Sequence, residues 1–167
     1  MAEALFITPK DLKEFTQLSG NMDEDKILQY IKIAQDTHVE NLLGTDLKEA
    51  LQDGITNSNL TADETALLNN YVKDLTIHWA MVELLSFAAY TIGNKGIYKH
   101  FSENSETVTK EELDALIERH RARAEVYSDR FYRYMCHNNE LFPEYNSNTN
   151  EDISPIQPRP YPGGWML

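Results

Sequence analysis

The histidines are the residues whose type could support a metal site or acid–base chemistry, and the chain has five of them. In a di-iron helical bundle, a glutamate stands three residues before the histidine, so that both project from one helix face. None of the five has a glutamate there; the residues at that position are Gln35, Leu75, Ile97, Ile117 and Tyr134. The motifs H-E-x-x-H, C-x-x-C and G-x-x-x-x-G-K-S/T are also absent. We therefore expect no catalytic residues, no metal ligands, no cofactor and no enzymatic activity.

His78 and Glu83 lie together in the most apolar stretch of the chain and could form an acid–base pair. A separation of five residues, however, directs two side chains to different faces of a helix. Because buried polar groups are usually hydrogen-bonded for structural reasons, we interpret both as satisfied polar residues of the core or of an interface. The single cysteine, Cys136, cannot form an internal disulfide, and we expect a small buried side chain.

The formal net charge of −12 bears on the kind of partner that the chain binds. A protein that coats nucleic acid needs clustered lysine and arginine, so the acidic balance argues against that class. One interpretation is that the acidic charge favours solubility. The other is that an acidic wall lets DNA pass along the protein without adhering to it. The apolar stretch 75–92 is barely long enough to cross a bilayer and contains two ionisable side chains, so we expect a buried helix and no membrane contact. Without signal-peptide features at its start, the protein is expected to be intracellular.

One basic region interrupts the acidic chain, and its members are Arg119, Arg121, Arg123, Arg130 and Arg133. These side chains could contact DNA or an acidic neighbouring subunit. The alternative is a solvated helix face whose charges pair locally. Arg121–Glu125, Asp129–Arg133 and Glu118–Arg121 have the spacing of helical ion pairs, and we favour this second interpretation.

Hydrophobic periodicity and turn residues predict an all-α fold, a compact bundle of about five helices around a long apolar central helix. The expected helices cover residues 9–17, 24–43, 47–52, 61–91 and 110–137. Their starts are marked by Thr8 before Pro9, by Asp23, and by the capping boxes of Thr61 and Thr109. Gly44 is expected as a left-handed cap. Alternating residues at 97–108 indicate a small β-hairpin.

The composition changes after residue 137, which divides the chain into a helical body, 1–137, and an extended proline-rich arm, 138–167. Five of the six prolines follow residue 142, and no helix or central strand can run through the sequence PIQPRPYPGG. The arm nevertheless ends in Tyr161, Trp165, Met166 and Leu167. Since aromatic residues often anchor interfaces and prolines limit the entropy lost on docking, we expect the arm to bind a neighbouring chain.

The order of these segments resembles that of the head–tail connector (adaptor) proteins of tailed phages. The N-terminal part of the resemblance lies in ITPKDLKEF, in the segment DEDKILQYIKIAQDTHVENLLG that ends at Gly44, in TDLKEALQDG, and in the long apolar helix that follows. The C-terminal part, from NKGIYKHFSENSETVTKEELDALIERHRARAEVYSDRFYRYM to NNELFPEY, is similar to the version in crAss-like and other Bacteroides phages. The resemblance covers about residues 5–145.

The resemblance implies a helical subunit of a ring, typically twelve-fold, that lies beneath the portal protein at the head–tail joint of the virion. Such a ring also contacts tail or second-ring proteins, is assembled in the host cytoplasm, and lets DNA pass through without binding it specifically. It has no enzymatic activity.

A ring needs contacts between two different faces of one subunit. We expect the residues at these contacts to be Ile97, Tyr98, Phe101, Tyr161, Trp165, Met166 and Leu167. The alternative function is an acidic helical binding module that regulates or inhibits another protein, because an acidic surface can act as a decoy for a basic partner.

Overall fold

The computed structural model describes residues 3–18, 20–87, 90–93, 96–99, 109–147, 149 and 152–156. Its helical elements are, in chain order, α1 (Pro9–Phe15), α2 (Glu24–Ala34), the π-helical turn η1 (Gln35–Val39), α3 (Glu40–Leu43), α4 (Thr45–Asn57), α5 (Ala62–Leu67), the π-helical turn η2 (Leu68–Val72), α6 (Lys73–Phe87), α7 (Lys110–Asn138), the 3-10 turn η3 (Asn139–Leu141) and α8 (Pro143–Asn146). Two short strands, β1 (Tyr90–Gly93) and β2 (Gly96–Lys99), pair antiparallel. Helices dominate the described residues, which confirms the predicted all-α class.

Three helices begin with capping boxes, which are Thr8–Asp11, Thr61–Glu64 and Thr109–Glu112. In each box, the threonine hydroxyl accepts a hydrogen bond from the backbone N–H three residues later, and the carboxylate accepts one from the threonine N–H. Two helix donors that would otherwise lack partners are therefore satisfied. These caps explain why α1, α5 and α7 begin where the sequence predicts.

Helix α4 is longer than the predicted helix 47–52 and continues to Asn57 through a residue that was expected to end it. That residue is Gly54, and Leu60 from the following loop packs against it so closely that a Cβ there would lie 2.4 Å from Leu60 Cδ2. The glycine is thus used for close packing and not for a turn. Asn57 is the last residue of the helix, and Ser58, which has a positive φ of 55°, caps its C-terminal end.

Helix α6 ends at Phe87, earlier than the predicted end near residue 91. The next described residues form β1, whose Gly93 pairs with Gly96 of β2. Thr91 and Ile92 are β-branched and are followed by Gly93, and such residues favour an extended chain over a helix. This preference accounts for the earlier end of α6. Of the predicted hairpin at 97–108, residues 97–99 belong to β2 and residues 100–108 lie outside the described residues.

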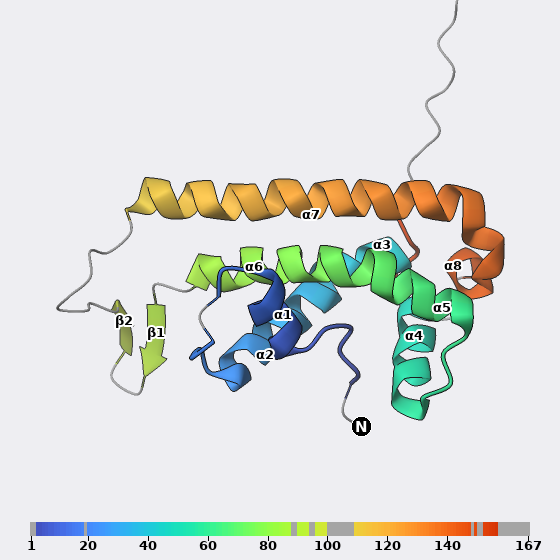
Figure 1. The fold of residues 1–167 in the computed structure, drawn as a ribbon, viewed down its shortest axis with the longest axis horizontal. Helices are drawn as coiled ribbons and strands as arrows, with labels where there is room; N and C mark the ends of the chain where they lie inside the picture. The colour runs from blue at the N-terminus through green and yellow to red at the C-terminus, as the bar shows by residue number, and fades with distance from the viewer. Residues whose placement is uncertain are drawn as a thin grey trace, which may run out of the picture.

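Figure 1 shows α6 between α7 on one side and α1 and α2 on the other. The side of α6 that faces α1 and α2 contributes the buried residues Ile77, Ala80, Met81 and Leu84. A second core cluster joins α5, η2 and the first turn of α6 to α3, α4 and the C-terminal half of α7, where Phe131 and Met135 are buried. Helix α6 buries residues on several sides, as expected of a helix packed within a bundle.

The core continues past residue 138, where the predicted arm begins. Phe142 is 1% exposed and Tyr145, in α8, is 3% exposed, and both belong to the cluster around α4 and α7. The first part of the predicted arm is therefore packed on the body of its own chain. Cys136 is exposed, contrary to expectation, because it directly follows the buried Met135 and is therefore rotated by about 100° around α7 from the buried side of that helix.

Candidate interaction surfaces

Two histidines meet in the seam between α6 and α7. The Nδ1 atoms of His78 and His120 are 3.2 Å apart, and the ring of Tyr127 stacks on His78 with 5.3 Å between centroids. A hydrogen bond at this distance requires one Nδ1–H donor and one Nδ1 acceptor, so the two neutral rings adopt different tautomers. The contact satisfies the Nδ1 atoms of both rings within the seam.

Burial, with a smaller contribution from nearby charges, lowers the pKa of both histidines and keeps both rings neutral. Burial, together with His120 and Arg123, lowers the pKa of His78 to about 4. Burial and Arg123 also lower the pKa of His120. Near pH 7 the two histidines therefore form a neutral hydrogen-bonded contact, and the role of this contact is to pack α6 against α7.

Glu83 belongs to a different contact, on another face of α6. Its Oε1 lies 2.8 Å from Nε2 of His38, and the His38 ring stacks on Trp79 with 4.0 Å between centroids. His78 and Glu83 therefore have separate partners, as their five-residue spacing predicts, and they do not form an acid–base pair.

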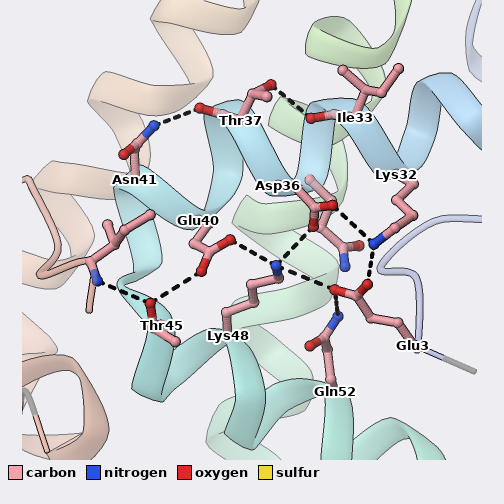
Figure 2. Close-up of polar contacts among 12 residues, drawn as sticks. Glu3, Lys32, Ile33, Asp36, Thr37, Glu40, Asn41, Thr45, Lys48 and Gln52 are labelled. Carbon is pink, nitrogen blue, oxygen red and sulfur yellow. Dashed lines mark hydrogen bonds and ion pairs between the residues drawn. The ribbon is translucent and has the colours of Figure 1, made fainter. Parts of the chain in front are cut away.

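Figure 2 shows a second polar cluster, in which Lys48 of α4 lies between carboxylates from different segments. Its Nζ is 2.8 Å from Asp36 Oδ1, 2.8 Å from Glu40 Oε2 and 3.3 Å from Glu3 Oε1. Burial lowers the pKa of Lys48, but the hydrogen bonds to Asp36 and Glu40 outweigh it and raise the pKa. The side chain is buried, so the cluster fixes α4 against η1 and the N-terminal segment.

Glu3 connects the N-terminal segment to this cluster. It accepts a hydrogen bond from Gln52 Nε2 at 3.0 Å and forms an ion pair with Lys32. The hydrogen bonds from Gln52 and Lys32 lower the pKa of Glu3 to about 2. Sequence reasoning missed this cluster. The available signal was the i,i+4 spacing of Lys32, Asp36 and Glu40, which places all three on one helix face.

The C-terminal strap, as we call residues 147, 149 and 152–156, crosses the junction of α3 and α4. The N–H of Thr45 donates to the carbonyl of Ile153 at 2.9 Å, and the N–H of Ile153 donates to Thr45 Oγ1 at 3.2 Å. The N–H of Ile156 donates to the carbonyl of Asn41 at 2.9 Å. The chain is therefore held at a defined point on the body up to Ile156.

Phe87 and Leu141 are two of the large apolar side chains that remain exposed among the described residues; the others are Phe15, Leu28, Ile33, Val126 and Ile156. Phe87, the last residue of α6, is 52% exposed and stacks on Tyr30 with 6.2 Å between ring centroids. Leu141, in the turn between α7 and α8, is 50% exposed. The C-terminal end of α6 and the turn before α8 lie toward opposite ends of the long axis (Figure 1).

An apolar hollow of about 190 Å³ lies between the N-terminal segment, the end of α4 and the η2 turn. We call it the α4–η2 hollow, and its lining residues are Leu5, Phe6, Ile55, Leu60, Thr65, Leu68, Asn69 and Lys73. Phe6 and Leu68 are buried, whereas Leu5, Ile55 and Leu60 are half-buried, so apolar surface is open to solvent within it.

The predicted arginine residues are all exposed on α7, and they are Arg119, Arg121, Arg123, Arg130 and Arg133. The ion pairs that they form within the helix are Arg121–Glu118 at 3.1 Å and Arg133–Asp129 at 2.8 Å. The guanidinium carbon of Arg130 lies 5.2 Å from the ring centroid of Tyr71. Two of the three predicted local pairs are therefore present, and Arg121 pairs with Glu118 and not with Glu125.

The residues predicted to form subunit contacts cannot be placed on this surface. Ile97 and Tyr98 belong to β2, for which the structure describes the backbone pairing alone. Those outside the described residues are Phe101, Tyr161, Trp165, Met166 and Leu167. Their assignment to an interface stays a prediction.

Among the described residues, no three or more His, Cys, Asp or Glu side chains come together in a way that could hold a metal ion. No helix in the described ranges combines the length and the apolar character needed to cross a membrane.

The sequence also matches the model of a known protein family, described as a family of unknown function (DUF6712), over residues 39–154. The match covers more than half of the chain and runs from the end of η1 into the C-terminal strap. Comparisons with curated proteins and with solved structures gave no match.

Proposed function

The chain belongs to the family of unknown function DUF6712, and we propose that it is a structural subunit of a head–tail connector ring in a tailed phage. In this proposal, about twelve copies form a ring that docks under the portal protein and joins the head to the tail or to a second ring. The ring is part of the virion and is assembled in the host cytoplasm. The subunit acts by binding other proteins and not by catalysis.

The observation that carries the proposal is the position of Phe87 and Leu141, two exposed apolar side chains toward opposite ends of the body. A closed ring is built from heterologous contacts, in which one patch of a subunit meets a different patch of the next. An aromatic side chain that is half exposed and stacked on Tyr30 is the kind of residue that anchors such a contact. We call the surface at Phe87 one patch and the surface at Leu141 the other. Because the two patches lie toward opposite ends of the body, each copy can bind two neighbours.

The charge of the chain agrees with a role around DNA. With a net charge of −12, a wall made of this protein repels the phosphate backbone at short range. Such a wall lets DNA slide through a channel without specific binding. The exposed arginines of α7 then face an acidic neighbouring subunit and not the genome.

The remaining predicted features supply further contacts of the ring. The apolar central helix gives each subunit a rigid core, and the hairpin region near 97–108 and the proline-rich segment beyond Ile156 reach neighbouring proteins. The residues proposed for these contacts are those predicted from the sequence: Ile97, Tyr98, Phe101, Tyr161, Trp165, Met166 and Leu167.

Copurification from the native source tests the function directly. The tagged full-length chain is isolated, and the proteins that accompany it are identified by mass spectrometry. We expect portal, capsid and tail proteins, and we expect the chain in purified particles. Recovery of a single soluble regulatory partner, without particle proteins, would contradict the connector and favour the inhibitor module.

Two single variants test the heterologous contact. Phe87→Ser and Leu141→Ser each remove one patch, so sedimentation velocity of either concentrated variant should show loss of assemblies larger than a monomer. An equimolar mixture should form dimers, because each variant keeps the patch that the other lacks, but no ring. Val126→Ser is the matched control, since Val126 is 67% exposed on α7, outside both patches. A mixture that stays monomeric while the wild-type chain assembles contradicts this pairing.

A further inference from the structure

The α4–η2 hollow has the size and the lining of a site for one aromatic side chain. Its volume of about 190 Å³ exceeds that of a cavity of about 150 Å³, which is large enough for benzene. The apolar wall includes the half-buried Leu5, Ile55 and Leu60, and the exposed Thr65 and Asn69 lie at its edge. A side chain with an apolar ring and one hydrogen-bond donor suits such a lining, because the hydroxyl and amide oxygens at the edge can accept.

We propose that this hollow binds the segment 157–167 of a neighbouring copy of the chain, with Trp165 as the side chain that enters it. Trp165 combines a large apolar ring with a single N–H donor. This inference rests on the ring proposed above, since it specifies how one subunit of that ring holds the next.

The strap explains how the segment reaches a neighbour. The hydrogen bond from Ile156 to Asn41 fixes the point at which the segment leaves the body. Prolines at 158, 160 and 162 favour an extended polyproline conformation, in which the six residues 157–162 span about 19 Å at about 3.1 Å per residue. The two glycines that follow, 163 and 164, allow the chain to turn before Trp165.

The segment is long enough to reach a neighbouring copy. The strap lies at Thr45 and the hollow at Ile55, ten residues later on the same helix, which corresponds to about 15 Å at about 1.5 Å per residue. The nine residues from 157 to 165 span about 28 Å when extended. This reach exceeds the distance to the hollow of the same chain, so Trp165 can extend beyond it and enter the hollow of the next copy; cross-links between differently labelled chains distinguish the two arrangements.

Site-specific photocrosslinking of the full-length chain tests the inference. Trp165 is replaced by benzoyl-phenylalanine in an isotopically heavy chain, which is mixed with a light chain and irradiated at a concentration where assemblies form. We expect cross-links between heavy and light chains in the peptides that contain Leu5, Ile55 or Leu68. Cross-links that map elsewhere, that join a chain to itself, or that do not form would overturn the inference.

A pair of variants in the light chain adds a second measurement. Ile55→Gln places an amide in the wall of the hollow and should lower the cross-linking yield about tenfold, which corresponds to about 1.4 kcal/mol of binding. Ile33→Gln is the control, because Ile33 is exposed on α2 and does not line the hollow; its yield should equal that of the wild type. Equal yields for both variants count against the hollow as the site.

The two proposals fail in different ways. If the chain is found in particles but its cross-links lie outside the hollow, the connector function stands and the docking site is wrong. If heavy–light cross-links map to the hollow while the chain is absent from particles, the docking site is supported and the connector function is wrong.

Discussion

Pro155 lies directly over Gly44. A Cβ built on Gly44 would be 2.6 Å from Pro155 Cδ and 3.2 Å from the carbonyl oxygen of Ile153. Gly44 also has a φ of 78°, a conformation that side chains with a Cβ rarely adopt. The positive φ of the expected left-handed cap is therefore present, but the ψ of 157° lies outside the left-handed helical region. A second requirement accompanies it: the C-terminal strap needs the space that a side chain would fill.

Gly44→Ala should destabilise the fold and release the strap. Strain at the positive φ costs about 1–3 kcal/mol, and the methyl group displaces Pro155. Urea unfolding should show a lower midpoint, and hydrogen exchange at the amides of Thr45 and Ile156 should become faster. The control is Gly20→Ala, because a Cβ there meets no atom within 4 Å. Unchanged exchange in Gly44→Ala would show that the strap does not depend on this contact.

Phe142→Ala tests whether the core extends beyond residue 138. Phe142 is 1% exposed, and removal of a buried phenylalanine side chain typically costs about 3–5 kcal/mol. Its neighbour Leu141 is 50% exposed, so Leu141→Ala should change the free energy of unfolding by less than about 1 kcal/mol. Denaturant unfolding of the two variants measures both values. Equal losses would mean that the segment after α7 is not part of the core.

Lys48→Met leaves the carboxylates of Glu3, Asp36 and Glu40 without their buried cation. Removing one partner of a fully buried ion pair costs about 3–5 kcal/mol. Because the Glu3 and Asp36 side chains are about one-third exposed, the loss here should lie below that range; methionine nearly preserves the length of the side chain. Lys32→Met is the matched control, because the Lys32 side chain is 51% exposed and an exposed pair contributes about 0–1 kcal/mol. Chemical denaturation at pH 7 should rank Lys48→Met well below Lys32→Met in stability. The reverse order would place the stabilising charge at Lys32.

The lowered pKa of Glu3 gives stability a dependence on acid pH. Because the pKa falls from 4.5 to about 2 on folding, the unfolded chain takes up the proton first. The contribution of Glu3 is present above about pH 4.5 and is lost as the pH falls toward 2. Glu3→Gln should remove this part of the pH dependence, measured as the difference in unfolding midpoint between pH 5 and pH 2.5. A difference equal to that of the wild type would contradict the role of Glu3.

His78 produces a separate dependence at higher pH. Its pKa falls from 6.5 to about 4 on folding, so the neutral form is favoured in the native seam. The stability that this form contributes is complete above about pH 6.5 and is lost as the pH falls toward 4. In a histidine-resolved NMR titration, the signal of His78 should therefore titrate near pH 4. His78→Gln should flatten the stability profile between pH 6.5 and 4, whereas His137→Gln, an exposed position on α7, should not.

Helix starts could be predicted from the sequence because they depend on neighbouring residues. Thr61 and Glu64, or Thr109 and Glu112, carry the whole capping box within four positions. Helix ends depend on distant packing, and there the predictions differ from the structure. Gly54 does not end α4, because Leu60 packs against it. Phe142 is buried because it packs in the cluster around α4 and α7, and α4 is distant in the sequence.

The polar clusters were less predictable for the same reason. The partners of Lys48 come from positions 3, 36 and 40, and no local pattern shows that these side chains converge. The His78–His120 contact joins residues that are 42 positions apart. The five-residue spacing of His78 and Glu83 could exclude a pair on one helix, but it could not identify the histidine that each of them contacts.

The π-helical turn at Gln35–Val39 constrains how the length of the chain can vary. Such a turn equals an α-helix with one residue inserted. In this turn, the side-chain oxygen of Gln35 accepts a hydrogen bond from the N–H of Phe6 at 2.9 Å. Because this wide turn takes up the extra residue, deleting one residue from it would restore regular α-helix and leave α3 and α4 nearly in their present phase. Gly44 and Lys48 would then keep their partners. A one-residue deletion in the regular helix α2 would instead rotate the chain after it by about 100° relative to the chain before it, so the π-helical turn is a place where the length of this helix can change without a change of phase.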